Sequence, residues 1–308
     1  MPLDPQAALA IKAVGDLPAG LAPAELRRAY TEQRLRLLPP APAIAVVRDV
    51  SIPSTDGPVG ARFYSPDDDG IPRPLLVYFH GGGWMLGSVE LYDTACRRLA
   101  VKGNCAVLSV EYRLAPETTF PGAVNDAYAA TLWAAKNATA LHIDPGAIAV
   151  GGDSAGGNLA AVLAQMSHDS GEFHVALQVL IYPCTDMSRE YPSYARNASG
   201  YMLTRAAMNW FIETYVPNPA DRLDARASPL LRPNLAGLAP ALVIAAEFDP
   251  LVDDNEAYAL KLRQAGVATK YECFAGMHHP FFTLGKYIDA AARAEDLIAA
   301  EMKALART

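Results

Sequence analysis

The chain has 308 residues, 51% of them hydrophobic and 19% charged, a composition typical of a globular protein with a large buried core. The formal net charge is −7. A negatively charged chain does not attract the phosphate backbone, which argues against nucleic acid as a partner. The four cysteines are spread out without metal-ligand spacing, so we expect reduced thiols and no metal. Because no apolar run reaches the ~20 residues of a membrane span and residues 1–11 lack an export signal, we expect no membrane partner and a cytoplasmic location.

The N-terminal part predicts two helices and a hairpin. The helices are expected at Ala7–Val14 and Pro23–Leu38, with the proline-rich stretch 39–42 ending the second. Two alternating runs, 46–52 and 60–65, are separated by turn residues and predict an antiparallel pair of strands.

Strand and helix signals then alternate along the chain. Strands are expected at 75–79, 105–110, 148–150, 177–182, 241–246 and 269–274, and helices at 91–102, 121–137, 154–168, 253–264 and 290–306. Near-continuous apolar strands between helices indicate an α/β fold, with a mostly parallel sheet covered by helices on both faces.

One long segment, 187–218, interrupts this alternation. It carries six aromatic residues and is too long for a plain connection between two strands. We expect it to form, together with the N-terminal helices, a helical cap over the sheet. The predicted organisation is therefore a cap segment at 1–45, the first part of the core at 46–186, a cap insertion at 187–218 and the second part of the core at 219–308.

A candidate nucleophile lies in Gly152-Asp153-Ser154-Ala155-Gly156, which fits the pattern GxSxG. The pattern falls between a predicted strand and a predicted helix, where a tight, strained turn lifts the serine hydroxyl out of the sheet. A glycine-rich helix start with Ser154 as a simple cap is the alternative. The strand-turn-helix context favours a nucleophile.

A second glycine-rich motif, His80-Gly81-Gly82-Gly83-Trp84, follows the strand that ends at Phe79. Consecutive glycines leave backbone N–H groups uncovered, and such groups can stabilise a developing oxyanion. The N–H of Ala155, at the start of a helix, would add a further donor. A phosphate-binding loop is the alternative, but no Lys-Ser/Thr follows the glycines. His80 is expected to brace the loop.

The candidate base and acid follow two other strands. His278 and His279 come after the strand 269–274, at the sheet edge where catalytic groups gather. Asp249 follows the strand 241–246, and Pro250 restricts it to an extended conformation. Asp253 and Asp254 are the competing carboxylates, but they suit the start of the next helix. The order Ser154, Asp249, His279 is that of α/β-hydrolases.

At these motifs the chain resembles the bacterial hormone-sensitive lipase family of esterases over nearly its whole length. The shared motifs are His80-Gly81-Gly82-Gly83-Trp84, Tyr112-Arg113-Leu114-Ala115-Pro116-Glu117, Gly152-Asp153-Ser154-Ala155-Gly156-Gly157, Asp249-Pro250-Leu251-Val252-Asp253-Asp254 and Gly276-Met277-His278-His279. The stretch from Gly200 to Phe211 also resembles the cap of that family, and Asp153 places the chain nearer its GDSAG group.

The resemblance implies an eight-stranded α/β-hydrolase sheet with a helical cap, and hydrolysis of short- to medium-chain acyl esters without a cofactor. It implies Gly82, Gly83 and Ala155 as oxyanion donors, and Glu117 as a brace of the site. The family's Gly-x-x-His-Gly-Phe reads Gly276-Met277-His278-His279-Pro280-Phe281 here, which implies His279 as the base and His278 as a neighbour at the pocket or surface.

The predicted function is a serine carboxylesterase that acts on a small-molecule ester, as a monomer or homodimer. The expected pocket residues are Trp84, Met85, Tyr201, Leu203 and Phe281. Amide or N-formyl hydrolysis by the same triad, a lipase at lipid interfaces and a non-catalytic receptor for a small ligand are the alternatives. The filled triad argues against the receptor, and the absence of a strongly amphipathic basic helix argues against the lipase.

Overall fold

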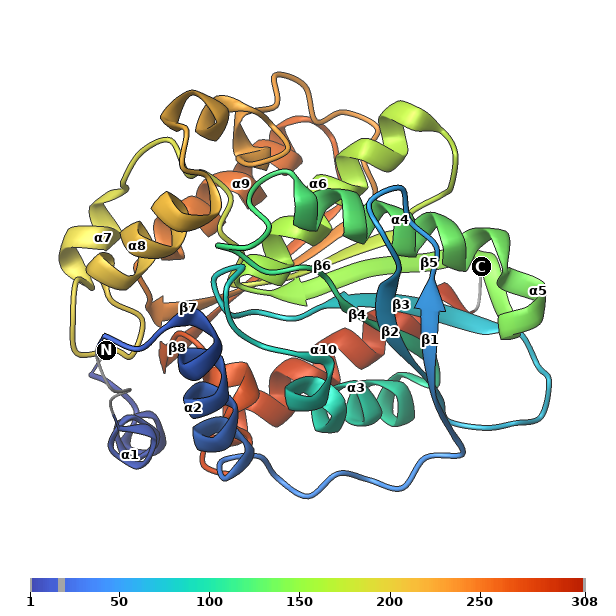
Figure 1. Ribbon diagram of the computed structural model, residues 1–308, viewed down its shortest axis with the longest axis horizontal. Helices are drawn as coiled ribbons and strands as arrows, with labels where there is room; N and C mark the ends of the chain where they lie inside the picture. Colours follow the sequence, from blue (N-terminus) through green and yellow to red (C-terminus); the bar gives the residue numbers. More distant parts are fainter. Residues whose placement is uncertain (1, 16–19, 307–308) are drawn as a thin grey trace.

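The protein is built around one twisted sheet. The computed structural model describes residues 2–15 and 20–306, and within them the sheet has eight strands in the order β1-β2-β4-β3-β5-β6-β7-β8 (Figure 1). The strands are β1 (Val46–Ile52), β2 (Val59–Ser65), β3 (Arg73–Phe79), β4 (Ala106–Glu111), β5 (Ile143–Asp153), β6 (Leu177–Ile181), β7 (Ala241–Phe248) and β8 (Thr269–His278).

The pairing of the strands confirms the predicted fold class. β1 and β2 form the antiparallel hairpin, and β2 is antiparallel to β4. The remaining neighbours are parallel. All seven residues of β3 are buried, as a strand covered on both faces requires.

Helices cover both faces of the sheet (Figure 1). One face carries α3 and α10, which pack against each other, and the other carries α4, α6 and α9. The bounds of the helices that flank the sheet are α3 (Val89–Gly103), α4 (Gly122–Lys136), α5 (Ala138–Leu141), α6 (Ala155–Ser170), α9 (Val252–Gln264) and α10 (Asp289–Leu305).

Two predicted strands are longer than their apolar runs suggest. The apolar run Ile148–Val150 is the centre of β5, which continues to Asp153 because its last residues pair with β3 and β6. β8 runs on to His278, which pairs with Phe248 after an irregularity in the ladder. Pairing with a neighbouring strand extends both elements into glycine-containing sequence.

Four further helices lie beyond the carboxyl ends of the parallel strands (Figure 1). They are α1 (Pro5–Val14), α2 (Pro23–Leu35), α7 (Pro192–Arg196) and α8 (Arg205–Tyr215). α1 is tied to β8, since the N–H of Asp4 donates to the carbonyl of Gly276 at 3.0 Å. The helices at both predicted cap segments therefore lie on the side of the sheet where the motif residues end.

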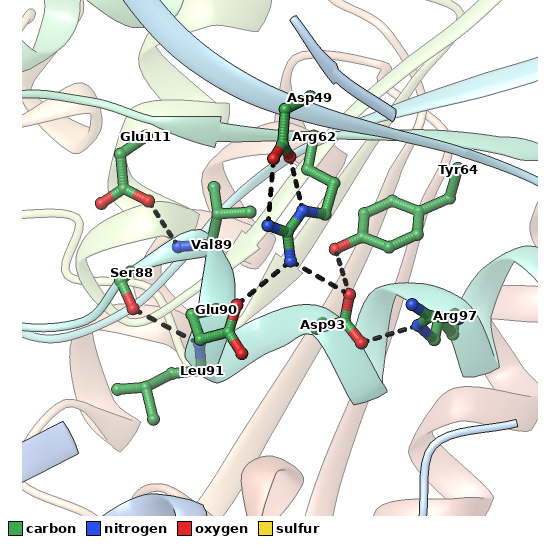
Figure 2. Close-up of polar contacts among 10 residues, drawn as sticks. All are labelled: Asp49, Arg62, Tyr64, Ser88, Val89, Glu90, Leu91, Asp93, Arg97 and Glu111. Atoms are coloured by element: carbon green, nitrogen blue, oxygen red, sulfur yellow. Dashed lines mark hydrogen bonds and ion pairs between the residues drawn. The ribbon is translucent and has the colours of Figure 1, made fainter. Parts of the chain in front are cut away.

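A polar cluster fastens the start of α3 to the hairpin (Figure 2). Arg62 on β2 bonds Asp49 on β1 at 2.6 Å and reaches Asp93 on α3 at 3.4 Å. At the first turn of α3, Ser88 accepts from the N–H of Leu91 at 3.3 Å and thereby caps the helix. These contacts hold the downstream end of the segment that contains the three glycines.

Candidate active site

The candidate nucleophile lies on a sharp turn between β5 and α6. Ser154 has φ 56° and ψ −117°, a backbone conformation that a residue with a side chain rarely adopts and that costs about 1–3 kcal/mol. A Cβ at Gly152 would lie 2.2 Å from the carbonyl oxygen of Phe79, and one at Gly156 would lie 1.8 Å from it. Both glycines of the motif are thus required by the close approach of β3.

The three candidate catalytic side chains form one hydrogen-bonded chain. His279 Nε2 lies 2.9 Å from Ser154 Oγ, and His279 Nδ1 lies 2.7 Å from Asp249 Oδ2. Ser154, His279 and Asp249 follow β5, β8 and β7, and their exposed fractions are 9%, 4% and 0%. This is the geometry in which an imidazole can take a proton from a serine hydroxyl while a carboxylate fixes its orientation.

Asp249 is held in place through its carboxylate and through its backbone carbonyl. Its Oδ1 accepts from the N–H of Leu251 at 2.9 Å, and its backbone carbonyl accepts from the amide of Asn197 at 2.9 Å. The competing carboxylates have other partners: Asp253 pairs with Arg196 at 2.6 Å, and Asp254 accepts from the N–H of Thr185. The structure therefore brings Asp249, and neither competitor, to the imidazole.

The glycine loop places free N–H groups beside Ser154. Within the described residues, the N–H groups of Gly82, Gly83 and Ala155 donate to no protein acceptor. Gly82 and Gly83 have φ values of 123° and 61°, and a Cβ on Gly83 would lie 2.3 Å from the ring of Phe211 on α8. A glycine is required at Gly83 because the cap helix packs directly on it. The N–H of Ala155 is also at the N-terminus of α6, where the helix dipole favours negative charge.

The buried carboxylate of Asp153 holds the glycine loop in place, a role that the sequence motif does not reveal. Asp153 accepts hydrogen bonds from Tyr78 Oη at 2.9 Å, from Tyr92 Oη at 2.8 Å and from the N–H of Gly81 at 2.9 Å. Burial raises the pKa of Asp153, and the two tyrosine hydroxyls oppose that rise. The contacts join β3, α3 and the glycine loop to the residue next to the nucleophile.

The two histidines beside the motifs are structural neighbours in this arrangement. His80 is fully buried and stacks on Tyr112 with ring centroids 4.3 Å apart, so it braces the loop as predicted; burial lowers its pKa. The expectation for His278 is wrong, because its side chain is fully buried and does not line the cavity. Its Nδ1 lies 2.8 Å from the carbonyl of His279. The continuation of β8 turns this residue into the protein.

A cavity of about 530 Å³ opens above Ser154 and His279. Its walls come from the glycine loop, from α1 and α2, and from the segment that includes α8. Two of the expected pocket residues, Trp84 and Leu203, line it. Trp84 also stacks on Tyr215 at 4.8 Å, which ties this wall to the cap.

The other three expected pocket residues lie outside the lining of this cavity. Met85 is buried in the core, with 3% of its surface exposed. Tyr201 packs on Phe248, with ring centroids 4.9 Å apart. Phe281 is fully buried and packs against Phe274. Each side chain is used for packing between elements that the sequence pattern does not bring together.

Arg27 on α2 is a further residue that sequence reasoning missed. Its guanidinium donates to the carbonyl of Met85 at 2.8 Å, to the carbonyl of Ala115 at 2.7 Å and to Glu117 at 2.6 Å. Glu117 therefore acts on the site through the cap helix, and its side chain is 58% exposed. The contacts fasten α2 to the loop next to Trp84, whose carbonyl accepts from the N–H of Ala115.

The described part of the chain contains no cluster of three or more side chains arranged to hold a metal ion. Among the helices described, none is both long enough and apolar enough to cross a bilayer. Cys96, Cys105, Cys184 and Cys273 are all unpaired.

Comparison with known proteins supports the fold. Residues 76–283 match the sequence family described as alpha/beta hydrolase fold. The carboxylic ester hydrolase LipN of Mycobacterium tuberculosis is 44% identical over 252 residues, which are 80% of this chain and 67% of the relative. The ethyl acetate hydrolase of Pseudomonas putida is 42% identical over 271 residues, 87% of this chain and 85% of the relative.

A solved structure agrees over nearly the whole molecule. EstE1, a thermophilic carboxylesterase cloned from a metagenomic library, superposes with a TM-score of 0.90 at 44% identity and covers 94% of this chain and 99% of its own. The chain belongs to the alpha/beta-hydrolase family. Its resemblance to the hormone-sensitive lipase esterases, inferred from five motifs, is confirmed by these relatives.

Proposed function

We propose that the protein is a serine carboxylesterase in which Ser154 is the nucleophile, His279 the general base and Asp249 the residue that orients the imidazole. One observation carries the proposal: the continuous hydrogen-bonded chain from Asp249 through His279 to Ser154, on the strained turn at the floor of the cavity. The esterase names of relatives more than 40% identical support the reaction class.

The reaction proceeds in two acyl transfers. His279 takes the proton of Ser154 as Oγ attacks the ester carbonyl, and the C=O bond becomes a C–O⁻ single bond. As the tetrahedral intermediate collapses, the bond to the alcohol oxygen breaks and His279 protonates the leaving alcohol. Water then attacks the acyl-serine with His279 again as base, which releases the acid and restores Ser154.

The oxyanion is stabilised by the N–H groups of Gly82, Gly83 and Ala155. Each of these donors is free of protein acceptors within the described residues, and one such donor is typically worth ~3 kcal/mol in the transition state. Residues of the cap form part of the cavity wall, and a hydrogen bond less exposed to water is electrostatically stronger.

The substrate is proposed to be a small ester with a short to medium acyl chain, which a cavity of about 530 Å³ can hold. No cofactor is used in this scheme. A cytoplasmic location and a monomeric or homodimeric state remain predictions from the sequence.

Steady-state hydrolysis of p-nitrophenyl butyrate by wild type and Ser154→Ala tests the proposal. Wild type is expected to show saturable turnover, and the variant to fall to the background rate while its thermal unfolding stays cooperative. Substantial turnover by a folded Ser154→Ala enzyme would reject Ser154 as the nucleophile.

A further inference from the structure

The cavity has one charged wall that the reaction scheme does not use. Among the residues lining the cavity, the described cationic side chains are Lys12 on α1 and Arg34 on α2. Neither takes part in an ion pair within residues 2–15 and 20–306. The acidic side chain in the lining, Asp153, is already bonded to two tyrosine hydroxyls and a backbone N–H.

Arg34 is unusual among the side chains of α2 because donor groups of its guanidinium are buried without an acceptor. Its Nε and Nη1 atoms have almost no solvent exposure, and neither is hydrogen-bonded to a described residue. The guanidinium carbon lies 5.1 Å from the centroid of the Tyr30 ring. The ring stabilises the positive charge, but it does not accept hydrogen bonds from the buried N–H groups. A buried donor without an acceptor costs free energy.

The neighbouring side chains of α2 show the contrast. Gln33, one residue earlier, donates to the carbonyl of Val14 at 2.7 Å and so joins α2 to α1. Arg27, two turns earlier, bonds two backbone carbonyls and Glu117. Gln33 holds α1 and α2 together and Arg27 fastens α2 to the core, whereas no described residue accepts from the buried Nε and Nη1 of Arg34.

Arg34 lines the same cavity as Ser154 and His279. Tyr182 packs against His279 with ring centroids 4.4 Å apart. Burial raises the pKa of the Tyr182 hydroxyl, and the positive charge of Arg34 works against that rise. Because Arg34, Ser154 and His279 line one cavity, an ester held at Ser154 can extend toward the guanidinium.

We propose that Arg34 is a specificity residue that binds a carboxylate carried by the substrate itself, so that the preferred esters have a free carboxylate some distance from the scissile bond. This inference rests on the esterase function proposed above. A guanidinium keeps its charge and offers planar, paired N–H donors that match the two oxygens of a carboxylate. A monoanion neutralises one half-buried cation and satisfies donors that are unmet without substrate.

The carboxylate can belong to the acyl part or to the alcohol part of the ester, and two substrate series separate these cases. In the first, the monoethyl esters of succinate, glutarate and adipate are compared with ethyl esters of the unbranched monoacids of the same length. In the second, the butyrate ester of a hydroxybutyrate is compared with butyl butyrate. The pair with the largest ratio of kcat/KM, anionic over neutral, identifies which part carries the charge and at what length.

The decisive variant is Arg34→Met, which keeps a long, helix-compatible side chain and removes the charge and the donors. We expect it to lower kcat/KM for the preferred anionic ester by about tenfold, mainly through KM, which corresponds to the loss of one charge-assisted contact. The neutral partner is expected to change by less than about twofold. Arg34→Lys is expected to recover only part of the ratio, because an ammonium lacks the planar fork.

Arg28→Met, on the exposed side of the same helix, is the matched control and should leave the ratio at the wild-type value. Adipate, a product of the first series, should raise the Tm of wild type and Arg28→Met but not of Arg34→Met; this readout does not depend on turnover.

Three results would overturn the inference. They are an anionic-to-neutral ratio that Arg34→Met leaves unchanged, an equal fall in the ratio with Arg28→Met, or an equal loss of neutral and anionic activity in Arg34→Met with a lowered Tm. Failure of the proposed function is recognised separately: wild type would then hydrolyse none of the neutral esters, p-nitrophenyl butyrate included.

Discussion

The edge of the sheet at the carboxyl ends of its parallel strands, here called the rim, and the cap helices have different roles in this molecule. At the rim, each candidate catalytic group follows its own parallel strand and has its partner already in place, as in the contact between His279 and Asp249 at 2.7 Å. In the cap, contacts come from helices far away in the chain, such as the bonds from Arg27 to Met85 and Ala115. The rim sets which chemistry occurs, and the cap sets how the glycine loop and the cavity are shaped around it.

Substitutions in the rim and in the cap should therefore have different effects on the enzyme. A change at the rim should remove turnover with little effect on substrate binding, because it removes groups that act in the transition state. A change in the cap should alter KM, selectivity or stability and leave a measurable kcat. Four substitutions, from the strongest expected effect to the weakest, test this division.

Asp249→Asn is expected to cause the largest loss. An amide cannot hold the imidazole in the tautomer that accepts the proton of Ser154, so kcat should fall by about 10⁴-fold with little change in KM. Hydrolysis of p-nitrophenyl butyrate measures this. Asp253→Asn, which alters a carboxylate paired with Arg196, should keep its turnover; if both variants lose activity equally, the assignment of Asp249 is wrong.

Gly83→Ala tests the place where cap and rim meet. Its methyl group would collide with the Phe211 ring at 2.3 Å, and displacement of the oxyanion donor should lower kcat by about 10²-fold. The double variant Gly83→Ala/Phe211→Ala should regain part of this loss. Gly171→Ala has nearly the same φ, 62°, but open space around the added methyl group, and should show a stability cost only. A double variant no better than Gly83→Ala would mean that Phe211 is not the obstacle.

Arg27→Met should have a moderate effect, mainly on KM and stability, as expected for a residue of the cap. It leaves the carbonyls of Met85 and Ala115 without this donor, at a cost of about 1–3 kcal/mol. We expect a Tm lower by a few degrees and a kcat/KM for p-nitrophenyl butyrate lower by about tenfold, mostly through KM. A large fall in kcat with unchanged KM and Tm would instead place Arg27 in the chemistry.

Glu117→Gln should give the smallest effect. The hydrogen bond from Arg27 holds the pKa of Glu117 below its ordinary value. The stabilisation is therefore present above the unfolded-state pKa and is lost as the pH falls through the lowered folded-state pKa. Since this carboxylate is mostly exposed, we expect less than about 1 kcal/mol. Tm differences between wild type and variant should be largest near neutral pH and vanish in acid; a constant difference would refute the ion-pair origin.

The candidate catalytic residues and the sheet could be predicted from the sequence, because short motifs and the order of the strands mark them. The strand-turn-helix context of Ser154, the proline after Asp249 and the position of His279 after the last strand were enough to assign the site that the structure brings together. The mostly parallel sheet and its leading hairpin followed from the alternation of apolar runs, and the resemblance to the esterase family implied the eight strands.

Contacts between distant segments could not be predicted in the same way. Arg27 and Glu117 are 90 residues apart, and no local pattern marks either as a partner of the other. Phe281 and Tyr201 looked like pocket residues because they are aromatic and close to the motifs, yet the packing of neighbouring elements buries one and turns the other onto Phe248. His278 was misjudged because β8 continues four residues beyond the predicted strand 269–274, as far as His278 itself.

Covalent labelling shows directly whether Ser154 is the activated nucleophile. Diethyl p-nitrophenyl phosphate should phosphorylate an activated serine and release p-nitrophenol in a single burst equal to the amount of enzyme. We expect the diethylphosphoryl group on the peptide that contains Ser154, a parallel loss of activity, and a far slower reaction of Asp249→Asn. Inactivation with the label on a different residue, or an active enzyme that takes up no label at Ser154, would contradict this assignment.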